Sequence, residues 1–214
     1  AATRREAAHA VSKVLVTTNP TLLQEHARLG AIQPLIYLAK DVDSTNLQQF
    51  ESLMALTNLV SLGEAEQNKF IKEKGVPSAH YLMFSDHFMV RRAACEVFCN
   101  IPLEEALLNI MRKPDQVRLW VGLCYEWSNE EEPTEGPLIA RAVSGTLASA
   151  ANDSGVCAAL IEEDVGPALT SLLQSGKAEL IHRAFAVVIA MIESGGAPAA
   201  LHLLENNCVP GIAK

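Results

Sequence analysis

The sequence is poor in aromatic residues and lacks the cysteine spacings that hold metals or cross-link small domains. Phe, Trp and Tyr make up only 5% of its 214 residues, whereas 49% are hydrophobic. The core must therefore be built mainly from Ala, Leu, Val and Ile, which suits closely packed helices. The five cysteines form no C-x-x-C pair, and their number is odd. We expect no disulfide framework and no metal site, and a reducing compartment, with a cytoplasmic location as the default.

Basic residues are also scarce, and no apolar run is long. Lys and Arg number 17 against 25 Asp and Glu, which gives a net charge of −8. This balance argues against nucleic acid and against an anionic membrane as partners, because both need clustered cations. The longest apolar run, near 180–192, is interrupted by His182 and Arg183 and is too short to span a bilayer. The sequence shows no signal peptide and no initiating Met, so we expect a segment of a longer protein.

Motifs for catalysis are missing as well. Residues 41–46 depart from a calcium loop at Asn46, where Gly is needed, and at Ser52, where Glu is needed. The Ser-Gly-Gly at 194–196 is not followed by Gly-Lys-Ser/Thr, so we interpret it as a helix end and a turn rather than a phosphate loop. The six histidines show no H-E-x-x-H spacing. We predict that the chain is not an enzyme and uses no cofactor and no metal.

The sequence does contain an internal repeat, in which long Ala-rich helical segments alternate with shorter apolar helices. The long segments are 4–16, 50–62, 92–103, 141–153 and 183–194. Aligned at Arg5, Phe50, Arg92, Arg141 and Arg183, they start 45, 42, 49 and 42 residues apart. This period is typical of armadillo and HEAT solenoids, which use two or three helices per repeat. We predict one all-α segment over 1–214, an armadillo-type right-handed superhelical solenoid of about four to five three-helix repeats.

Gly and Pro residues indicate where the helices begin and end. Asn19–Pro20 has a capping residue followed by Pro, which favours a helix start. Gly30 and Gly75 are expected to end helices, because Gly adopts the left-handed conformation at little cost. Pro34 and Pro167 are expected in the first turn of the next helix, where a missing N–H does no harm.

The interval of 49 residues is explained by an acidic insertion near 128–136. It contains Glu130, Glu131, Glu132 and Glu135, followed by Gly-Pro. Insertions in repeat proteins map to surface loops. The acidic run is therefore either a solvated loop or a contact for a basic partner.

The candidate site is the concave groove that the third helices of such repeats line. Asn58 and Asn100 occupy equivalent positions, and an Asn side chain offers both a donor and an acceptor to a peptide backbone. The alternative is that both Asn brace adjacent helices. The matching residues in the other copies are Lys13, Ser149 and, if the register holds, Met191.

Other residues of these helices complete the candidate groove. Met54 and Glu96 lie one turn before the two Asn, and Phe50, Arg92, Arg141 and Arg183 lie at the helix starts. The arginines would form a basic column able to attract an acidic segment of a partner. The alternative is that they are solvated and paired with nearby Glu.

Five segments of the sequence carry a resemblance to a known protein family. The segments that carry it are QFESLMALTNL (49–59), NKFIKEKGV (68–76), RRAACEVFCN (91–100), VRLWVGLC (117–124) with its acidic follow-on, and IHRAFAVVIAMI (181–192). In this order, along nearly the whole chain, they resemble the UCS family of myosin chaperones. The resemblance implies an armadillo domain that binds the myosin motor head and assists its folding or protects it, without hydrolysing ATP.

The resemblance also implies which residues and partners matter. It places Asn58 and Asn100 in a client-binding groove, together with Phe50, Met54, Arg92 and Glu96. It implies recruitment of Hsp90 through an N-terminal helical-repeat domain that is not present in this sequence. Where the family tends to have Asn in the last long helix, this sequence has Ala190 or Met191.

Two other protein classes remain open. An importin- or catenin-like armadillo adaptor would bind an extended peptide such as a basic localisation signal. Importin-type grooves place a Trp four residues before each groove Asn to hold Lys stems, but this sequence has Met54 and Glu96 there. A structural scaffold would instead leave the groove empty and bind partners through the acidic loop.

Overall fold

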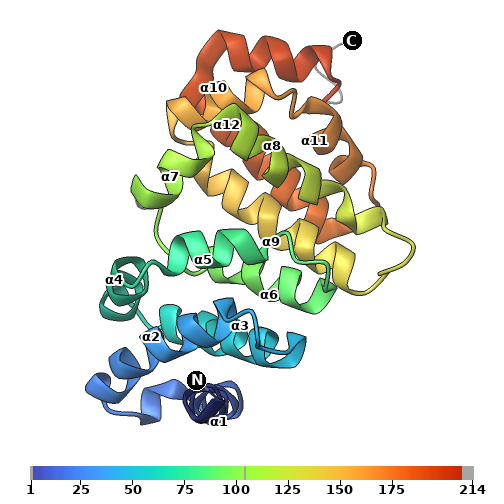
Figure 1. Cartoon of the computed structure of the whole chain (residues 1–214). Helices are drawn as coiled ribbons and strands as arrows, with labels where there is room; N and C mark the ends of the chain where they lie inside the picture. Colours follow the sequence, from blue (N-terminus) through green and yellow to red (C-terminus); the bar gives the residue numbers. More distant parts are fainter. Residues whose placement is uncertain (1, 104, 209–214) are drawn as a thin grey trace. The chain divides into compact units, whose positions relative to one another are not determined.

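The computed structural model describes residues 2–103 and 105–208, and the regular elements among them are all helical. Contacts divide the chain into two compact units, unit 1 (residues 1–102) and unit 2 (residues 103–214). Unit 1 contains α1 (Ala2–Thr17), η1 (Pro20–Leu22), α2 (Glu25–Lys40), α3 (Asn46–Val60), α4 (Glu64–Lys72), α5 (Gly75–Leu82) and α6 (Phe88–Phe98) (Figure 1). The prediction of a single segment over 1–214 stays a prediction.

In unit 1 the three long helices α1, α3 and α6 pack in series. The middle helix, α3, contacts α1 and α6, while α2 packs against α1, α3, α4 and α5. Leu53, Leu56 and Leu59 of α3 are at most 1% exposed, so the core follows this helix. Thr45 caps α3, and its side chain accepts from the Gln48 N–H. The long segments predicted from the repeat are therefore real helices that stack side by side.

The predictions for Gly30 and Pro34 are wrong. Both residues lie inside α2, which runs unbroken from Glu25 to Lys40. Pro34 has no N–H to donate to the carbonyl of Gly30, four residues earlier, yet one missing bond does not end a helix whose flanking turns are packed. Ile32 and Leu35 are 0% exposed, and this burial outweighs the local cost. The first repeat in unit 1 thus has one long helix where two were expected.

The corner between α4 and α5 lies where expected but uses a different residue. Lys74, not Gly75, has the left-handed backbone (φ 61°), and Gly75 is the first residue of α5. Gly75 is required for another reason, since a Cβ there would lie 2.2 Å from Cε2 of Phe70. Gly75 thus allows the buried Phe70 ring to close the corner. Asn19, in contrast, caps Pro20–Leu22 as predicted, and its side chain accepts from the Thr21 N–H.

Unit 2 repeats this organisation. It contains α7 (Glu105–Met111), α8 (Pro114–Leu123), η2 (Cys124–Ser128), α9 (Glu135–Ala150), α10 (Ser154–Glu162), α11 (Gly166–Leu173) and α12 (Ala178–Glu205). The long helices α9 and α12 pack together, and α10 and α11 also contact α12. Pro167 lies in the first turn of α11, as predicted. Gly196 (φ 58°) breaks α12 into two helices, which confirms the predicted helix end and turn at 194–196.

Helix α12 meets a length-and-composition criterion for crossing a membrane. Its most apolar window has a mean hydropathy of 1.7, and 33% of that window is buried. The core helix of a soluble protein passes the same test, and α12 is bent at Gly196 with Val187 and Met191 fully buried. The expectation that the chain has no membrane partner stays a prediction.

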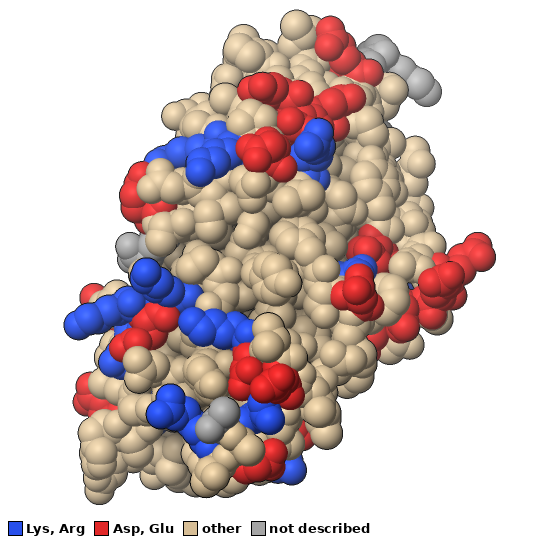
Figure 2. Space-filling view, viewed as in Figure 1, with Lys and Arg blue, Asp and Glu red and all other residues tan. Residues whose placement is uncertain are grey.

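The acidic segment lies between η2 and α9. Residues 130–131 and 133–134 form turns, and Glu130 and Glu131 are exposed. Figure 2 shows acidic residues gathered at the right edge of unit 2, where Figure 1 places this loop. Its role as a solvated loop or a contact for a partner stays open.

Candidate functional site on the long helices

Six of the eight predicted site residues lie in unit 1, on two neighbouring helices. They are Phe50, Met54 and Asn58 on successive turns of α3, Arg92 and Glu96 on α6, and Asn100 just after α6, and all six are half-buried. We call Phe50, Met54 and Asn58 the α3 row and Arg92, Glu96 and Asn100 the α6 row. Because α3 and α6 pack against each other, the two rows lie on adjacent helices of one unit.

Arg92, the first residue of the α6 row, contacts both Phe50 of the α3 row and Glu96 of its own row. Its guanidinium carbon lies 5.7 Å from the centre of the Phe50 ring, and its Nε lies 3.7 Å from Oε1 of Glu96. A cation over an aromatic face contributes about 0.5–1 kcal/mol at partly exposed sites. Both charged side chains are only about one-fifth exposed. Glu96 therefore already has a cationic neighbour, which weakens its attraction for a Lys of a partner.

Asn58 and Asn100 differ in whether their side-chain amides are already hydrogen-bonded within the chain. The Asn58 Nδ2 donates to the Leu15 carbonyl at 3.0 Å, so this residue braces α3 against α1. Leu15 lies in the last turn of α1, where carbonyls have no partner within their own helix. At Asn100 the backbone is bound: its carbonyl accepts from Gln67 Nε2 at 2.9 Å, and its N–H donates to the Val97 carbonyl at 3.2 Å. Among the described residues, its side-chain amide makes no hydrogen bond, so Asn100 is the better candidate for partner contact.

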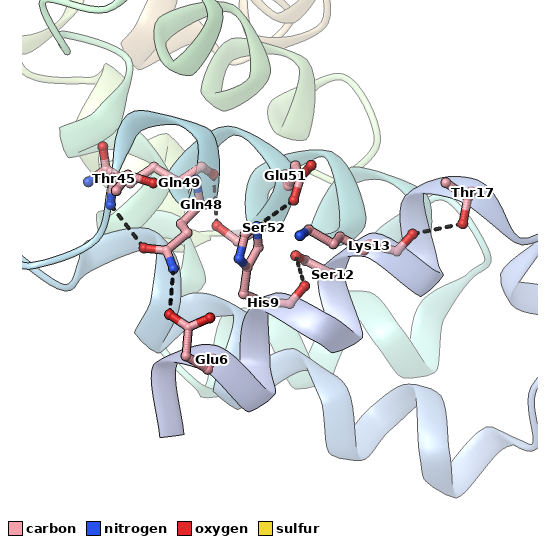
Figure 3. Close-up of polar contacts among 10 residues, drawn as sticks. All are labelled: Glu6, His9, Ser12, Lys13, Thr17, Thr45, Gln48, Gln49, Glu51 and Ser52. Atoms are coloured by element: carbon pink, nitrogen blue, oxygen red, sulfur yellow. Dashed lines mark hydrogen bonds and ion pairs between the residues drawn. The ribbon is translucent and has the colours of Figure 1, made fainter. Parts of the chain in front are cut away.

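A polar connection between α1 and α3 was not predicted from the sequence. His9 Nε2 lies 2.6 Å from Glu51 Oε2, and Gln48 Nε2 donates to Glu6 Oε1 at 3.3 Å (Figure 3). Both contacts span 42 residues, which is one of the repeat intervals. A search for polar pairs separated by one repeat would have found them.

The remaining two predicted site residues lie in unit 2. Arg141 of α9 pairs with Glu179 of α12 at 3.2 Å. The Arg183 guanidinium lies over Gly145, because a Cβ added there would be 3.5 Å from its carbon. Among the described residues Arg183 forms no ion pair. A basic column that includes both units stays a prediction.

The register of the last repeat differs from the predicted one. The Ser194 hydroxyl donates to the Ala151 carbonyl, and this bond spans 43 residues, as does the bond from Asn58 to Leu15. Ser194 is therefore the counterpart of Asn58. The expected match with Met191 is wrong by three residues, and Met191 is fully buried. A sequence alignment cannot fix the helix rotation that places a side chain toward the preceding carbonyl.

A cluster of metal ligands is not present in the described part of the chain, where no three His, Cys, Asp or Glu side chains come together. The expectations that the chain uses no metal and no cofactor and is not an enzyme stay predictions.

Known proteins resemble this chain in sequence and in fold. No protein-family model matches the sequence. The "Protein unc-45 homolog B" of Xenopus tropicalis is 32% identical over 146 residues, which cover 67% of this chain and 15% of that protein. The solved structure of UNC-45 from Drosophila melanogaster superposes with a TM-score of 0.82 at 30% identity, covering 94% of this chain and 25% of the other. The chain thus spans between a seventh and a quarter of the length of these relatives.

Two further structures describe the fold and a partner of a relative. A designed armadillo repeat protein superposes with a TM-score of 0.69 at 18% identity over 95% of this chain and 82% of its own, which shows an armadillo fold. The myosin chaperone UNC-45 from C. elegans, solved in complex with an Hsp90 peptide, superposes with a TM-score of 0.71 at 25% identity over 87% of this chain and 20% of its own. The chain is an all-α armadillo-type solenoid, and it belongs to the UCS (UNC-45) family of myosin chaperones.

Proposed function

We propose that this chain is a myosin-directed chaperone module that binds the myosin motor head through the exposed parts of its long helices. The binding surface in unit 1 would be formed by the α3 and α6 rows, with Phe50, Met54 and Asn100 as principal contacts. Arg141 and Arg183 would contribute from unit 2. Binding would assist folding of the motor head or protect it, and it would not require ATP hydrolysis by the chain.

The observation that carries this proposal is the relationship to UNC-45 together with the position of the half-buried rows. Phe50 and Met54 are large apolar side chains that remain partly accessible on a stacked helix. A partly folded client exposes apolar side chains, and these lose contact with water when they cover Phe50 and Met54. The Asn100 amide can bind a client backbone without reading its sequence. Each such bond contributes about 0.5–1.5 kcal/mol, so several contacts must act together.

An adaptor for basic peptides receives less support from these residues. Its groove needs an aromatic wall for Lys stems, and Met54 and Glu96 occupy those positions. Glu96 is moreover close to Arg92. Recruitment of Hsp90, implied by the family, would use a domain outside this sequence, and a cytoplasmic location follows from the same relationship as part of the proposal.

The test is direct binding of the chain to a purified myosin motor head, with a basic localisation peptide as the competing ligand. We expect saturable binding to the motor head that the peptide does not displace. Binding to the peptide alone would favour the adaptor, and binding to neither ligand would contradict the proposed site.

Variants locate the surface. Met54→Ala combined with Asn100→Ala should weaken motor binding about tenfold or more, because it removes an apolar contact and an amide. The exposed Asn68 of α4 gives a matched control, and Asn68→Ala should bind normally. Asn58→Ala is a poorer test, since it also removes the brace to Leu15. The proposed surface would be contradicted if the double variant bound the motor head normally. It would also be contradicted if the double variant lost thermal stability along with binding, because unfolding would then explain the weaker binding.

A further inference from the structure

A cleft of about 570 Å³ lies between α1, α2 and α4 of unit 1. Its walls include Arg4 of α1, Pro34, Tyr37 and Lys40 of α2, and Glu73 just after α4. We call it the basic cleft and define it by these five residues. Pro34, Tyr37 and Lys40 are three residues apart, so they follow one face of α2. Ligand pockets usually have volumes of about 300–1,000 Å³, and the basic cleft falls within that range.

The two basic side chains of the cleft are available to a ligand. Arg4 and Lys40 are both exposed, and in the part of the chain that the structure describes neither forms an ion pair. The guanidinium carbon of Arg4 lies 5.9 Å from the centre of the Tyr37 ring. This contact uses the face of the ring rather than an acceptor atom, so the guanidinium N–H groups stay available for hydrogen bonds. The Tyr37 hydroxyl also makes no hydrogen bond to any described residue.

The acidic residues around the basic cleft are already paired with other cations. Asp41 and Asp43, just after α2, each lie 3.3 Å from Arg5 Nη1. Glu73 Oε1 lies 2.8 Å from Lys69 Nζ, and Lys69 holds the pKa of Glu73 below its usual range. Figure 2 shows Lys and Arg side chains gathered around the start of α1 and over α4, with acidic ones between them. Because these carboxylates are engaged elsewhere, the cleft keeps its positive charge.

A carboxylate on a short apolar stem matches the groups of the basic cleft. Arg4 can donate two parallel N–H bonds to a carboxylate, and Lys40 adds a second cation. Pro34 and the ring of Tyr37 offer apolar surface to the CH₂ groups that carry the carboxylate. A phosphate group, with nearly two negative charges, would be repelled by Glu73 more strongly than a singly charged carboxylate. The cleft therefore favours Asp or Glu side chains of a peptide.

We propose that the basic cleft binds an acidic peptide segment of a partner protein. One carboxylate of the segment lies between Arg4 and Lys40, and its apolar groups pack on Pro34 and Tyr37. The chain as a whole has a net charge of −8 and repels acidic partners, so the cleft directs such a segment to one place on unit 1. This binding is independent of the proposed binding of myosin, because it uses none of the residues of the α3 and α6 rows.

The test is the fluorescence anisotropy of a labelled hexapeptide of alternating Glu and Leu, titrated with the 214-residue chain. We expect saturable binding that weakens as the salt concentration rises, because salt screens the attraction between exposed charges. Arg4→Gln and Lys40→Gln should each weaken binding about tenfold, since each removes a hydrogen bond to a charged group. Tyr37→Phe keeps the ring and removes only the hydroxyl, so it should weaken binding about threefold.

Two controls separate this site from general charge effects and from the myosin surface. Lys113 and Lys177 are exposed residues of unit 2, and Lys113→Gln with Lys177→Gln removes two positive charges that do not belong to the cleft. This variant should bind the acidic peptide normally. Met54→Ala with Asn100→Ala should also bind it normally, so a failure of the proposed myosin surface and a failure of the cleft can be told apart.

Three outcomes would overturn the proposal. The first is that the acidic peptide does not bind, or that a peptide of alternating Gln and Leu with the same label binds as tightly. The second is that Arg4→Gln and Lys40→Gln weaken binding no more than the unit 2 control does. The third is that inorganic phosphate displaces the peptide while chloride at the same ionic strength does not, which would assign the cleft to phosphate. Circular dichroism should show unchanged helicity for Arg4→Gln and Lys40→Gln, because both side chains are exposed.

Discussion

The joint between α1 and α3 in unit 1 and the joint between α9 and α12 in unit 2 are built at equivalent positions with different side chains. In both, a polar side chain donates to a carbonyl at the end of the preceding long helix, from Asn58 to Leu15 and from Ser194 to Ala151. Such carbonyls lack partners in their own helix, so the bond satisfies a need that every repeat shares.

A second contact between the same helices, about one and a half turns earlier, differs between the two units. Six residues before Leu15, His9 meets Glu51, whereas six residues before Ala151, Gly145 meets the Arg183 guanidinium. A charged pair in one repeat is thus replaced by packing on a glycine in the other. The comparison shows that the backbone requirement fixes one contact, while the neighbouring contact is free to change its chemistry.

The largest difference between the units is expected at their ion pairs. In unit 1 Arg28 Nε lies 2.7 Å from Glu66 Oε1, and the Glu66 side chain is only 4% exposed. Arg28→Ala should lower the free energy of unfolding by about 3–5 kcal/mol, because it leaves a buried carboxylate unpaired. In unit 2 Arg112 and Asp153 form a two-point pair, but the Arg112 side chain is 33% exposed. Arg112→Ala should therefore cost less, as measured by urea unfolding.

A double variant checks the cause of the Arg28 effect. Arg28→Met with Glu66→Met removes both charges and should recover part of the lost stability. If the double variant is as unstable as Arg28→Ala, packing rather than charge explains the loss.

The next largest effects on the free energy of unfolding are expected at the two glycines that begin α5 and α11, Gly75 and Gly166. Gly75→Ala places a Cβ 2.2 Å from Cε2 of Phe70, a fully buried ring, and should cost about 1–3 kcal/mol of unfolding free energy. Gly166→Ala places a Cβ 2.2 Å from Cγ and 2.4 Å from Cβ of Asn206, and rotation of the Asn206 side chain moves its Cγ but not its Cβ. We expect a loss at least as large at Gly166, because only a backbone shift relieves the contact between the two Cβ atoms, as measured by chemical denaturation of both variants. A smaller loss at Gly166 would mean that the backbone around Asn206 adjusts more easily than the Phe70 ring.

Acid should affect the joint made by Asp153 in unit 2. Hydrogen bonds from Arg112 lower the Asp153 pKa from 3.8 to about 2, helped by the N–H groups of Val156 and Gly155. A carboxyl whose pKa is depressed on folding stabilises the fold above its unfolded pKa, and this contribution disappears as pH falls from about 3.8 to about 2. Asp153→Asn keeps an oxygen to cap α10 and removes the charge, so its stability should depend less on pH in this window. Thermal melts between pH 5 and pH 2 check this, and parallel curves for both proteins would contradict it.

The smallest effect is expected at Gly145, and it is a gain. Gly145 lies inside α9 with helical backbone, and a Cβ there would lie at an ordinary contact distance of 3.5 Å from Arg183. Gly145→Ala should raise the free energy of unfolding by about 0.5–1 kcal/mol, because Ala loses less entropy in a helix. A loss of stability in thermal melts would show that the Arg183 side chain cannot adjust.

The existence and spacing of the long helices could be predicted, because Ala-rich apolar periodicity returns every 42 to 49 residues. Short-range signals were reliable at Asn19 and Pro167, where one residue decides the local backbone. They failed at Gly30 and Pro34, because burial of Ile32 and Leu35 keeps α2 continuous. Among the site residues, the sequence placed Asn58 on the correct helix but did not reveal that Leu15 already holds its amide.

The sequence by itself determined the helical class, the repeat and the family, because apolar spacing and residue identity are properties of the chain alone. Only the tertiary structure decided which polar groups are already engaged and which remain available. Asn58 and Asn100 have the same side chain, yet one bonds to the neighbouring helix and the other does not. The reason is physical, because the rotation and position of each helix against its neighbour set the distance from an amide to a carbonyl.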